Sequence, residues 1–150
     1  MADSSSMVER SLTAECGSAV ITQGFVTPAN RAALSEIVRN DHEPMDRRGR
    51  AVYLLGMWPD DETVATLVEV VDELDEAGRS AAASGIGRVK TRAGMSALEH
   101  LAGDPSPDVR RVAINGLGAA GTPEATAVLR RVRENDTSEI NRARALDLLG

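Results

Sequence analysis

Residues able to carry out acid–base, metal or nucleophilic chemistry are few in this chain of 150 residues. It holds two histidines, His42 and His100, and a single cysteine, Cys16. Two histidines cannot build a multi-histidine metal site, and we find no serine–histidine–aspartate arrangement around them. Cys16 has no basic neighbour apart from Arg10, so we interpret it as a small buried hydrophobic residue. We therefore predict no catalytic site, no metal site and no cofactor.

One segment matches the pattern of a dinucleotide-binding turn. Residues Gly116 to Gly121 read G-x-G-x-x-G, and Asp136 stands 20 residues after the first glycine. Such a turn must follow a strand in a sheet built from several strand–helix units, and the rest of the sequence supplies none. The same glycines end a repeated helical segment, so we interpret them as part of a helix end.

The elements that would position surface residues come from an internal repeat. Four helical segments end in leucine or isoleucine followed by glycine, and these glycines are spaced by 31, 31 and 32 residues. Eight residues before each glycine stands an arginine, and fourteen residues before three of them stands an acid. The glycines are Gly56, Gly87, Gly118 and Gly150, the arginines are Arg48, Arg79, Arg110 and Arg142, and the acids are Glu73, Asp104 and Asp136. Self-similarity at this period is typical of helical repeat arrays.

Each repeat also contains an earlier amphipathic segment, so two antiparallel helices, A and then B, are predicted in every unit. An equivalent leucine in each unit is followed three residues later by another aliphatic residue, which is helical spacing. One unit cannot bury its apolar face alone, but stacked units can. We predict an all-α fold, a short right-handed α-solenoid of about four HEAT-like helix pairs. The predicted repeats are 25–56, 57–87, 88–118 and 119–150.

Capping residues mark the predicted helix ends. The dipeptides Thr27-Pro28, Ser106-Pro107 and Thr122-Pro123 each place a hydroxyl before a proline, which is the pattern of a helix start. The glycine that ends each B helix is expected to adopt a positive φ as the C-terminal cap.

The two ends of the chain are predicted to differ from the repeats. Residues 1–24 are expected to form a disordered start and then a capping helix, because Val8, Leu12 and Cys16 recur four residues apart. The last unit ends at Gly150 without a polar capping repeat, so we expect an apolar face there. That face predicts a homodimer through the C-terminal repeat, most simply a two-fold one.

The segments Asp104–Gly118 and Gly121–Ala125 resemble HEAT-like repeats of the phycobilisome-lyase type. The resemblance covers residues 25–150, is strongest over 88–150, and is specific for fold but nearly silent on function. In that family the B-helix arginine and the acid of the preceding loop commonly form a ladder between repeats. The resemblance therefore implies a structural role for the seven arginines and acids of the repeat, with ligand contact by the arginines as the alternative.

HEAT-like folds also include enzymes and DNA-binding modules, which supply the alternatives. His42-Glu43 resembles the His-Glu pairs of deoxyhypusine hydroxylase, a di-iron enzyme, but that family carries four pairs and this chain has one. HEAT-like DNA alkyl-base glycosylases need a basic concave face, aromatic residues and a catalytic acid. Tyr53, Trp58 and Asp147 supply the residue types, but the acidic first half of the chain opposes DNA. Phycobilin lyases act with partner subunits on chromophorylated proteins, and only the repeat itself points to them.

Charge is unevenly distributed along the chain. The formal net charge is −6, and residues 41–76 hold 11 acids against three arginines. Residues 107–150 hold seven arginines against six acids, so the last third is near neutral. An acidic chain repels the phosphate backbone, which makes nucleic acid an unlikely partner. The acidic stretch is interpreted either as a solvated surface or as a site that attracts a protein with a basic surface.

The cellular location is predicted from what the sequence lacks. No apolar run approaches the roughly 20 residues that span a bilayer, so no membrane contact is expected. The start of the chain has no signal-peptide pattern, and a single cysteine permits no intrachain disulfide. Both observations favour the cytoplasm.

The surface expected to bind a partner is the one lined by the B helices. Positions seven and three before each repeat glycine are expected to point away from the core, and Trp58 either frames this surface or packs between repeats. The candidate partner-binding residues are Arg50, Tyr53, Trp58, Ser80, Ser84, Arg111, Asn115 and Asp147. We predict a non-enzymatic protein–protein interaction module, such as an adaptor, a regulator or an immunity-type binder. The alternative is a HEAT-like enzyme or DNA-binding module.

Overall fold

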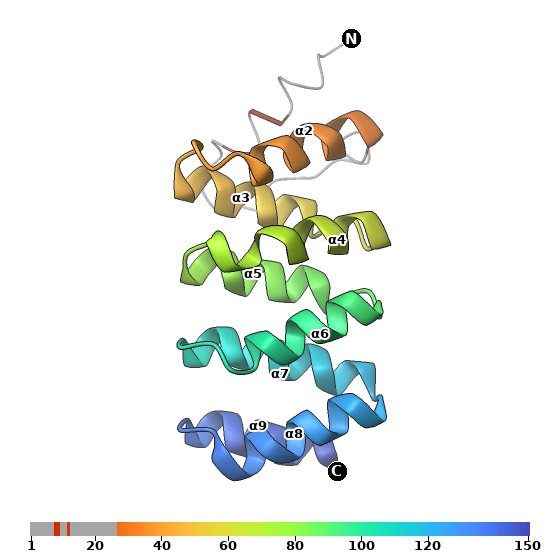
Figure 1. Ribbon diagram of the computed structural model, residues 1–150, viewed down its shortest axis with the longest axis vertical. Helices are drawn as coiled ribbons and strands as arrows, with labels where there is room; N and C mark the ends of the chain where they lie inside the picture. Colours follow the sequence, from red (N-terminus) through yellow and green to blue (C-terminus); the bar gives the residue numbers. More distant parts are fainter. Residues whose placement is uncertain (1–7, 10–11, 13–26) are drawn as a thin grey trace.

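The computed structural model describes residues 8–9, 12 and 27–150, and every regular element in this part of the chain is helical. Helices of type A and type B alternate along the sequence (Figure 1). The A helices are α2 (Pro28–Arg39), α4 (Asp61–Val70), α6 (Arg92–Leu101) and α8 (Pro123–Asn135), and the B helices are α3 (Met45–Leu55), α5 (Glu76–Ile86), α7 (Pro107–Ala120) and α9 (Glu139–Leu149). A 3₁₀ turn, η2 (Val71–Glu73), extends α4. The predicted all-α solenoid of four helix pairs is confirmed.

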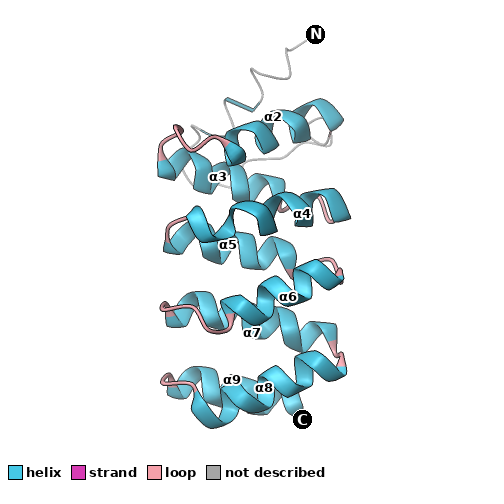
Figure 2. Cartoon of the chain, in the orientation of Figure 1, coloured by secondary structure: helices cyan, strands magenta, loops and turns pink. Residues whose placement is uncertain are grey.

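The helices form two layers. The A helices stack in the front layer of Figure 1 and the B helices lie behind them, with short loops at the two side edges (Figure 2). Neighbouring B helices contact one another more extensively than neighbouring A helices do. The B layer is therefore the more compact side of the stack, as a concave side must be.

Side-chain caps begin most of the helices. The hydroxyls of Thr27, Ser106 and Thr122 each accept a hydrogen bond from the backbone N–H three residues later, and a proline follows each of them. These bonds satisfy backbone donors that have no partner inside the helix. The predicted hydroxyl–proline starts are confirmed.

The glycine ends of the B helices differ from the prediction. Gly56 and Gly87 have φ values of −62° and −67°, and Gly118 lies within α7, which continues to Ala120. Only α7 ends in a left-handed glycine before the next helix begins, namely Gly121 with φ 64°. The expected positive φ is therefore wrong for Gly56, Gly87 and Gly118. Gly56 and Gly87 instead lie where neighbouring B helices approach closely.

The described parts of the N-terminal segment pack on the first helix pair. Val8 and Leu12 are buried in the hydrophobic core, and the Glu9 carboxylate lies 2.9 Å and 2.5 Å from two nitrogens of the Arg47 guanidinium. The rest of the predicted disordered start and capping helix, including Cys16, lies outside the described residues.

Candidate protein-interaction surfaces

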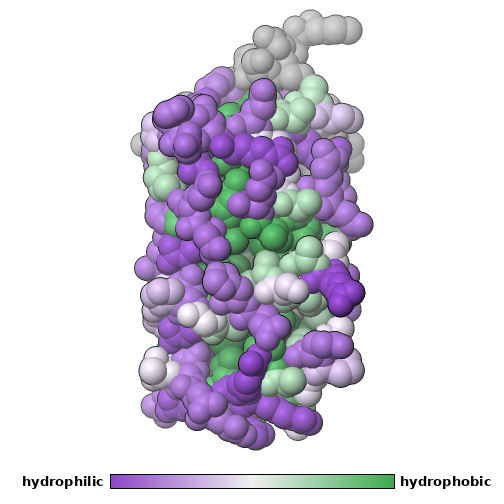
Figure 3. Space-filling model, in the orientation of Figure 1, coloured by the Kyte–Doolittle hydropathy of each residue, from purple (hydrophilic) through white to green (hydrophobic). Residues whose placement is uncertain are grey.

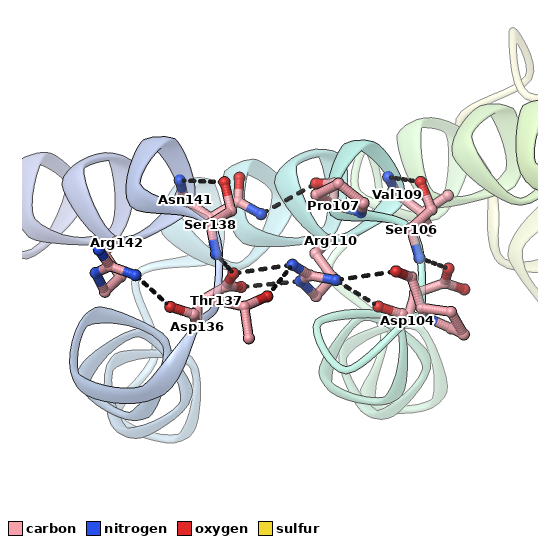
Figure 4. A network of polar contacts seen from close by, with 11 residues as sticks. Asp104, Ser106, Pro107, Val109, Arg110, Asp136, Thr137, Ser138, Asn141 and Arg142 are labelled. Atoms are coloured by element: carbon pink, nitrogen blue, oxygen red, sulfur yellow. Dashed lines mark hydrogen bonds and ion pairs between the residues drawn. The ribbon is translucent and has the colours of Figure 1, made fainter.

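A ladder of arginine–carboxylate pairs joins successive helix pairs beside the loops between A and B helices. Arg79 contacts both oxygens of Asp104, with its Nε and Nη2 atoms at 2.8 Å and 3.1 Å. Arg110 contacts both oxygens of Asp136 in the same way, at 3.0 Å each (Figure 4). The Nη1 atom of each arginine also donates a hydrogen bond to a carbonyl of its own helix pair. Arg79 bonds the Leu74 carbonyl and Arg110 bonds the Asp104 carbonyl, both at 2.9 Å. Each rung thus ties a B helix both to its own loop and to the loop of the next pair.

The first rung is less enclosed than the other two. Arg48 is buried and donates from Nε and Nη2 to the Val38 carbonyl, and its Nη2 lies 2.8 Å from a single oxygen of Glu73. The Glu73 side chain is 56% exposed, whereas those of Asp104 and Asp136 are 6% and 3% exposed. Glu73, which has a longer and more exposed side chain than the two aspartates, therefore makes one contact with its arginine where each aspartate makes two.

The two buried acids also organise the loops that carry them. Asp104 and Asp136 each accept a hydrogen bond from the backbone N–H two residues later, at 2.9 Å and 2.7 Å. Burial by itself would raise the pKa of both carboxyls, but the hydrogen bonds from the arginines and the backbone outweigh it and hold each pKa below its usual value. In the rungs of Arg79 and Arg110, the guanidinium donors and the carboxylate acceptors are paired with each other.

Ion pairs also bridge neighbouring A helices on the face formed by the A layer. Arg31 contacts Asp60 and Glu62 at the start of α4, and Arg131 lies 2.7 Å from Glu99. Arg39 with Glu69 makes a further bridge of the same kind, and the His100 Nε2 atom lies 3.0 Å from an oxygen of Asp72. Sequence reasoning missed these pairs, although their partners lie about one repeat apart. Figure 3 shows this face as hydrophilic side chains over apolar atoms that lie deeper between the helices.

Two open cavities of about 500 Å³ and 520 Å³ lie along the A layer between α6 and α8. Both are lined by Glu99 and Val128, so the Glu99–Arg131 pair stands between them. Their apolar lining includes Met95, Leu117 and Val132. The cavities follow from the looser packing of A helices in this part of the stack.

The B layer presents most of the predicted partner-binding residues to solvent. Tyr53 is 59% exposed on α3, and Ser84, Arg111, Asn115 and Asp147 are exposed on the B helices that follow it. Ser80 is half-buried. Arg144 of α9 belongs to the same surface, because its Nε donates a hydrogen bond of 2.7 Å to the side-chain oxygen of Asn115. The sequence did not single out this arginine. These residues form a row across all four B helices.

Two predicted partner-binding residues do not belong to this surface. Trp58 is only 8% exposed and is part of the hydrophobic core, and its backbone N–H donates to the Leu55 carbonyl in the turn after α3. Arg50 donates from Nη1 to the Leu12 carbonyl at 2.8 Å and so holds the N-terminal segment. Trp58 thus lies in the core and does not frame the B-layer surface.

The other sequence motifs are placed plainly by the structure. Gly116 and Gly118 lie inside α7 and Gly121 caps it, so the G-x-G-x-x-G segment is a helix end and no strand precedes it. His42 is almost fully exposed in the loop before α3, next to Asp41. Within the described ranges, no group of three or more His, Cys, Asp or Glu residues is placed to hold a metal ion. None of the helices described there has the length and apolar character of a membrane span.

Comparison with known proteins supports the fold. The structure is similar to a chain in the complex of CpcE and CpcF of phycocyanin lyase from Nostoc sp. PCC7120, with a TM-score of 0.71, 17% identity and 98% coverage of both chains. It is also similar to human deoxyhypusine hydroxylase, with a TM-score of 0.65, 22% identity and coverage of 79% of this chain and 43% of the hydroxylase. The chain thus spans less than half of that enzyme.

Sequence comparisons point the same way. No curated protein matches the sequence. The family described as HEAT repeats matches residues 67–150, which is more than half of the chain. The chain therefore belongs to the HEAT-repeat family, with repeats that resemble those of the phycobilisome-lyase type.

Proposed function

We propose that this protein is a non-enzymatic interaction module that binds another protein on its B layer. The observation that carries the proposal is the exposed ring of Tyr53, which starts a row of polar and charged side chains along the B helices. Tyrosine and arginine are the residue types that most often anchor protein interfaces, and Arg111 lies in this row. The buried polar side chains of Arg48, Asp104 and Asn141 hydrogen-bond between helix pairs or loops, which supports a scaffold role.

A second surface could carry the partner, namely the acidic edge of the first two helix pairs. Asp41, Asp46, Asp72, Asp75 and Glu76 are all exposed near the loops between A and B helices. A partner with a basic surface would be attracted to this edge. The acidic edge differs from the B layer in both charge and position, so one experiment separates the two.

The comparisons supply indirect support. One similar structure is from the complex of CpcE and CpcF of phycocyanin lyase, and the other is deoxyhypusine hydroxylase, so the support concerns work in a complex and not the absence of an activity. By analogy with the first, we propose that this chain also works in a complex. A cytoplasmic location is a separate proposal. The two-fold homodimer predicted through the C-terminal repeat is a separate proposal, and light scattering tests it against the monomer mass of 15.9 kDa.

The decisive experiment is affinity capture from nuclease-treated native lysate, followed by mass spectrometry. A double variant, Tyr53→Ala with Arg111→Ala, is expected to lose a protein that the wild type captures. Lys90→Ala with Arg92→Ala is the matched control, because both side chains are exposed but lie on the loop before α6 and at its start. A partner that both double variants retain would move the site to the acidic edge. A partner lost only from the control would contradict the B-layer proposal.

A further inference from the structure

Neighbouring A helices contact each other least between α6 and α8, and the space between these two helices is here called the A-layer groove. The two cavities of about 500 Å³ and 520 Å³ lie along it. Glu99 and Arg131 pair between the cavities with side chains that are 52% and 63% exposed, whereas Leu117 and Val128 are buried in the cavity walls. The groove therefore holds apolar surface beneath hydrophilic side chains, as the rest of this face does (Figure 3).

One end of the A-layer groove lacks the bridge that closes the equivalent end between α2 and α4. There Arg31, in the fourth position of α2, contacts Asp60 and Glu62 at the start of α4. Met95 takes the fourth position of α6, and it lines the 520 Å³ cavity. Glu124 of α8 stands where α4 has Glu62, and it has no ion pair among the residues that the structure describes. This end of the groove therefore remains open and is bordered by an apolar side chain.

Two cations stand at the open end, on either side of the N-cap of α6. Lys90 precedes the capping Thr91, Arg92 follows it, and both line the 520 Å³ cavity. Both are exposed, and neither has an ion pair within the described ranges. Lys90 is the only lysine in the chain, and α6 is the only one of α2 to α9 that begins with a cation. The helix dipole disfavours positive charge at a helix start, so both residues lower the stability of the free protein.

The acids that line the same cavity do not offset these cations. Glu99 is paired with Arg131, and Glu124 lies in the first turn of α8, where an acid offsets the dipole of its own helix. The segment from Arg88 to Arg92 holds three cations and no acid. The open end of the groove is therefore positive. Charges that lower stability and have no partner inside the fold indicate a role in binding.

We propose that the A-layer groove binds a segment of another protein in which aliphatic side chains stand next to carboxylates. An aliphatic side chain of the segment fills the 520 Å³ cavity over Met95, and its carboxylates face Lys90 and Arg92. These carboxylates also offset the dipole at the start of α6, so binding removes a charge cost that the free protein bears. The site lies on the A layer and does not rest on the B-layer proposal.

The stability of the free chain tests whether the two cations serve the fold. Lys90→Glu with Arg92→Glu is expected to raise the unfolding temperature by about 2–5 °C, because acids suit a helix start. Arg130→Glu with Arg133→Glu is the matched control, since both arginines are exposed on α8 and neither lines the two cavities. The control is expected to give no rise. A lower unfolding temperature for the Lys90 and Arg92 variant would show that these cations stabilise the fold, and would overturn the proposal.

The single lysine makes the site directly testable by cross-linking. Proteins captured by the wild type are treated with a carbodiimide, which joins a carboxylate to an amine without a spacer, and Lys90 offers the only side-chain amine of this chain. Mass spectrometry is expected to find Lys90 joined to an aspartate or glutamate in an aliphatic segment of a captured protein. Lys90→Arg is expected to abolish this cross-link but not the capture, because the charge is kept. Absence of any such cross-link would overturn the proposal.

A synthetic peptide of the cross-linked segment then measures the charge contribution. Lys90→Glu with Arg92→Glu is expected to lower the affinity of the purified chain for this peptide by about tenfold or more, and added salt is expected to weaken the wild-type affinity. Arg130→Glu with Arg133→Glu is expected to leave the affinity unchanged. Equal affinity of both double variants and the wild type would contradict binding in the groove.

The capture experiment on the B layer is read separately for each protein found. A groove protein is lost with Lys90→Ala and Arg92→Ala and kept by Tyr53→Ala with Arg111→Ala. A B-layer protein shows the opposite behaviour. The two proposals therefore fail separately.

Discussion

The contribution of a ladder residue to the free energy of unfolding depends on how completely its neighbours bury it. Asp136 accepts two bonds from Arg110 and one from the Ser138 backbone, and is almost fully buried. Glu73 makes one contact with Arg48 and is more than half exposed. Removing one partner of a buried pair leaves an uncompensated charge, whereas an exposed pair contributes little.

Asp136→Asn is therefore expected to lower the free energy of unfolding by about 2–4 kcal/mol at neutral pH. Glu73→Gln, the matched control, is expected to cost less than about 1 kcal/mol. Because the folded pKa of Asp136 lies below its unfolded value, the wild type binds fewer protons folded than unfolded at acidic pH. This contribution is complete above about pH 4–5 and disappears as the pH falls through the folded pKa. Denaturant unfolding followed by circular dichroism from pH 7 to pH 2 measures both effects, and a difference from wild type that persists undiminished at pH 2 would contradict them.

At the scale of the helices, the B layer is held together by glycines that face one another across units. A Cβ on Gly85 would lie 3.1 Å from the Cα of Gly56 and 2.8 Å from a methyl of Leu67. Gly87 and Gly116 make an equivalent pair, with their Cα atoms close to the position of a Cβ. The neighbouring backbone would have to move by a few tenths of an ångström to admit a Cβ, which packed backbone does less readily than a flexible side chain. Glycine at these positions therefore allows the close packing of α3, α5 and α7.

Gly85→Ala is expected to destabilise the protein by about 1–3 kcal/mol, because overpacking outweighs the gain in helix propensity. Gly49→Ala in α3 is the matched control, since a Cβ there meets nothing within 4 Å. That substitution is expected to stabilise by about 0.5–1 kcal/mol. Urea unfolding of the two variants beside the wild type is the measurement. The packing argument fails if both substitutions change stability in the same direction.

At the scale of the whole molecule, charge is separated along the stack. The first two helix pairs carry most of the acidic excess, and the last two are close to neutral. The arginines of the last pairs are partly neutralised by the ladder and by the A-layer bridges. Such a surface attracts proteins with basic patches more readily than it attracts a phosphate backbone.

We therefore expect no measurable binding to duplex DNA at about 150 mM salt, where nonspecific affinity depends on neutralising phosphates. Fluorescence anisotropy with a labelled duplex, repeated at low salt, is the measurement. Binding that survives physiological salt and falls steeply with added salt would favour the DNA-binding alternative. The charge argument would then be wrong.

The sequence by itself determined the repeat, the pairing of helices and the recurring arginines and acids, while their role as a ladder was implied by the resemblance to HEAT-like repeats. These follow from a contact made again in every unit, so the same residue types recur at the same spacing, as Arg79 and Arg110 do. Exposure of Tyr53 and Arg111 could be read from the same register, because a helix has a fixed period.

Only the tertiary structure decided features that depend on the distance between units. The spacing of residues does not show whether Trp58 is buried or exposed. It also does not show that Gly56 and Gly87 allow neighbouring helices to approach closely, and that neither adopts the left-handed conformation of a helix cap. The cross-helix bridge of Arg131 likewise depends on how far one pair is displaced from the next. Periodicity describes a single helix, whereas offset and separation between helices are set by the packing of all the side chains at the contact.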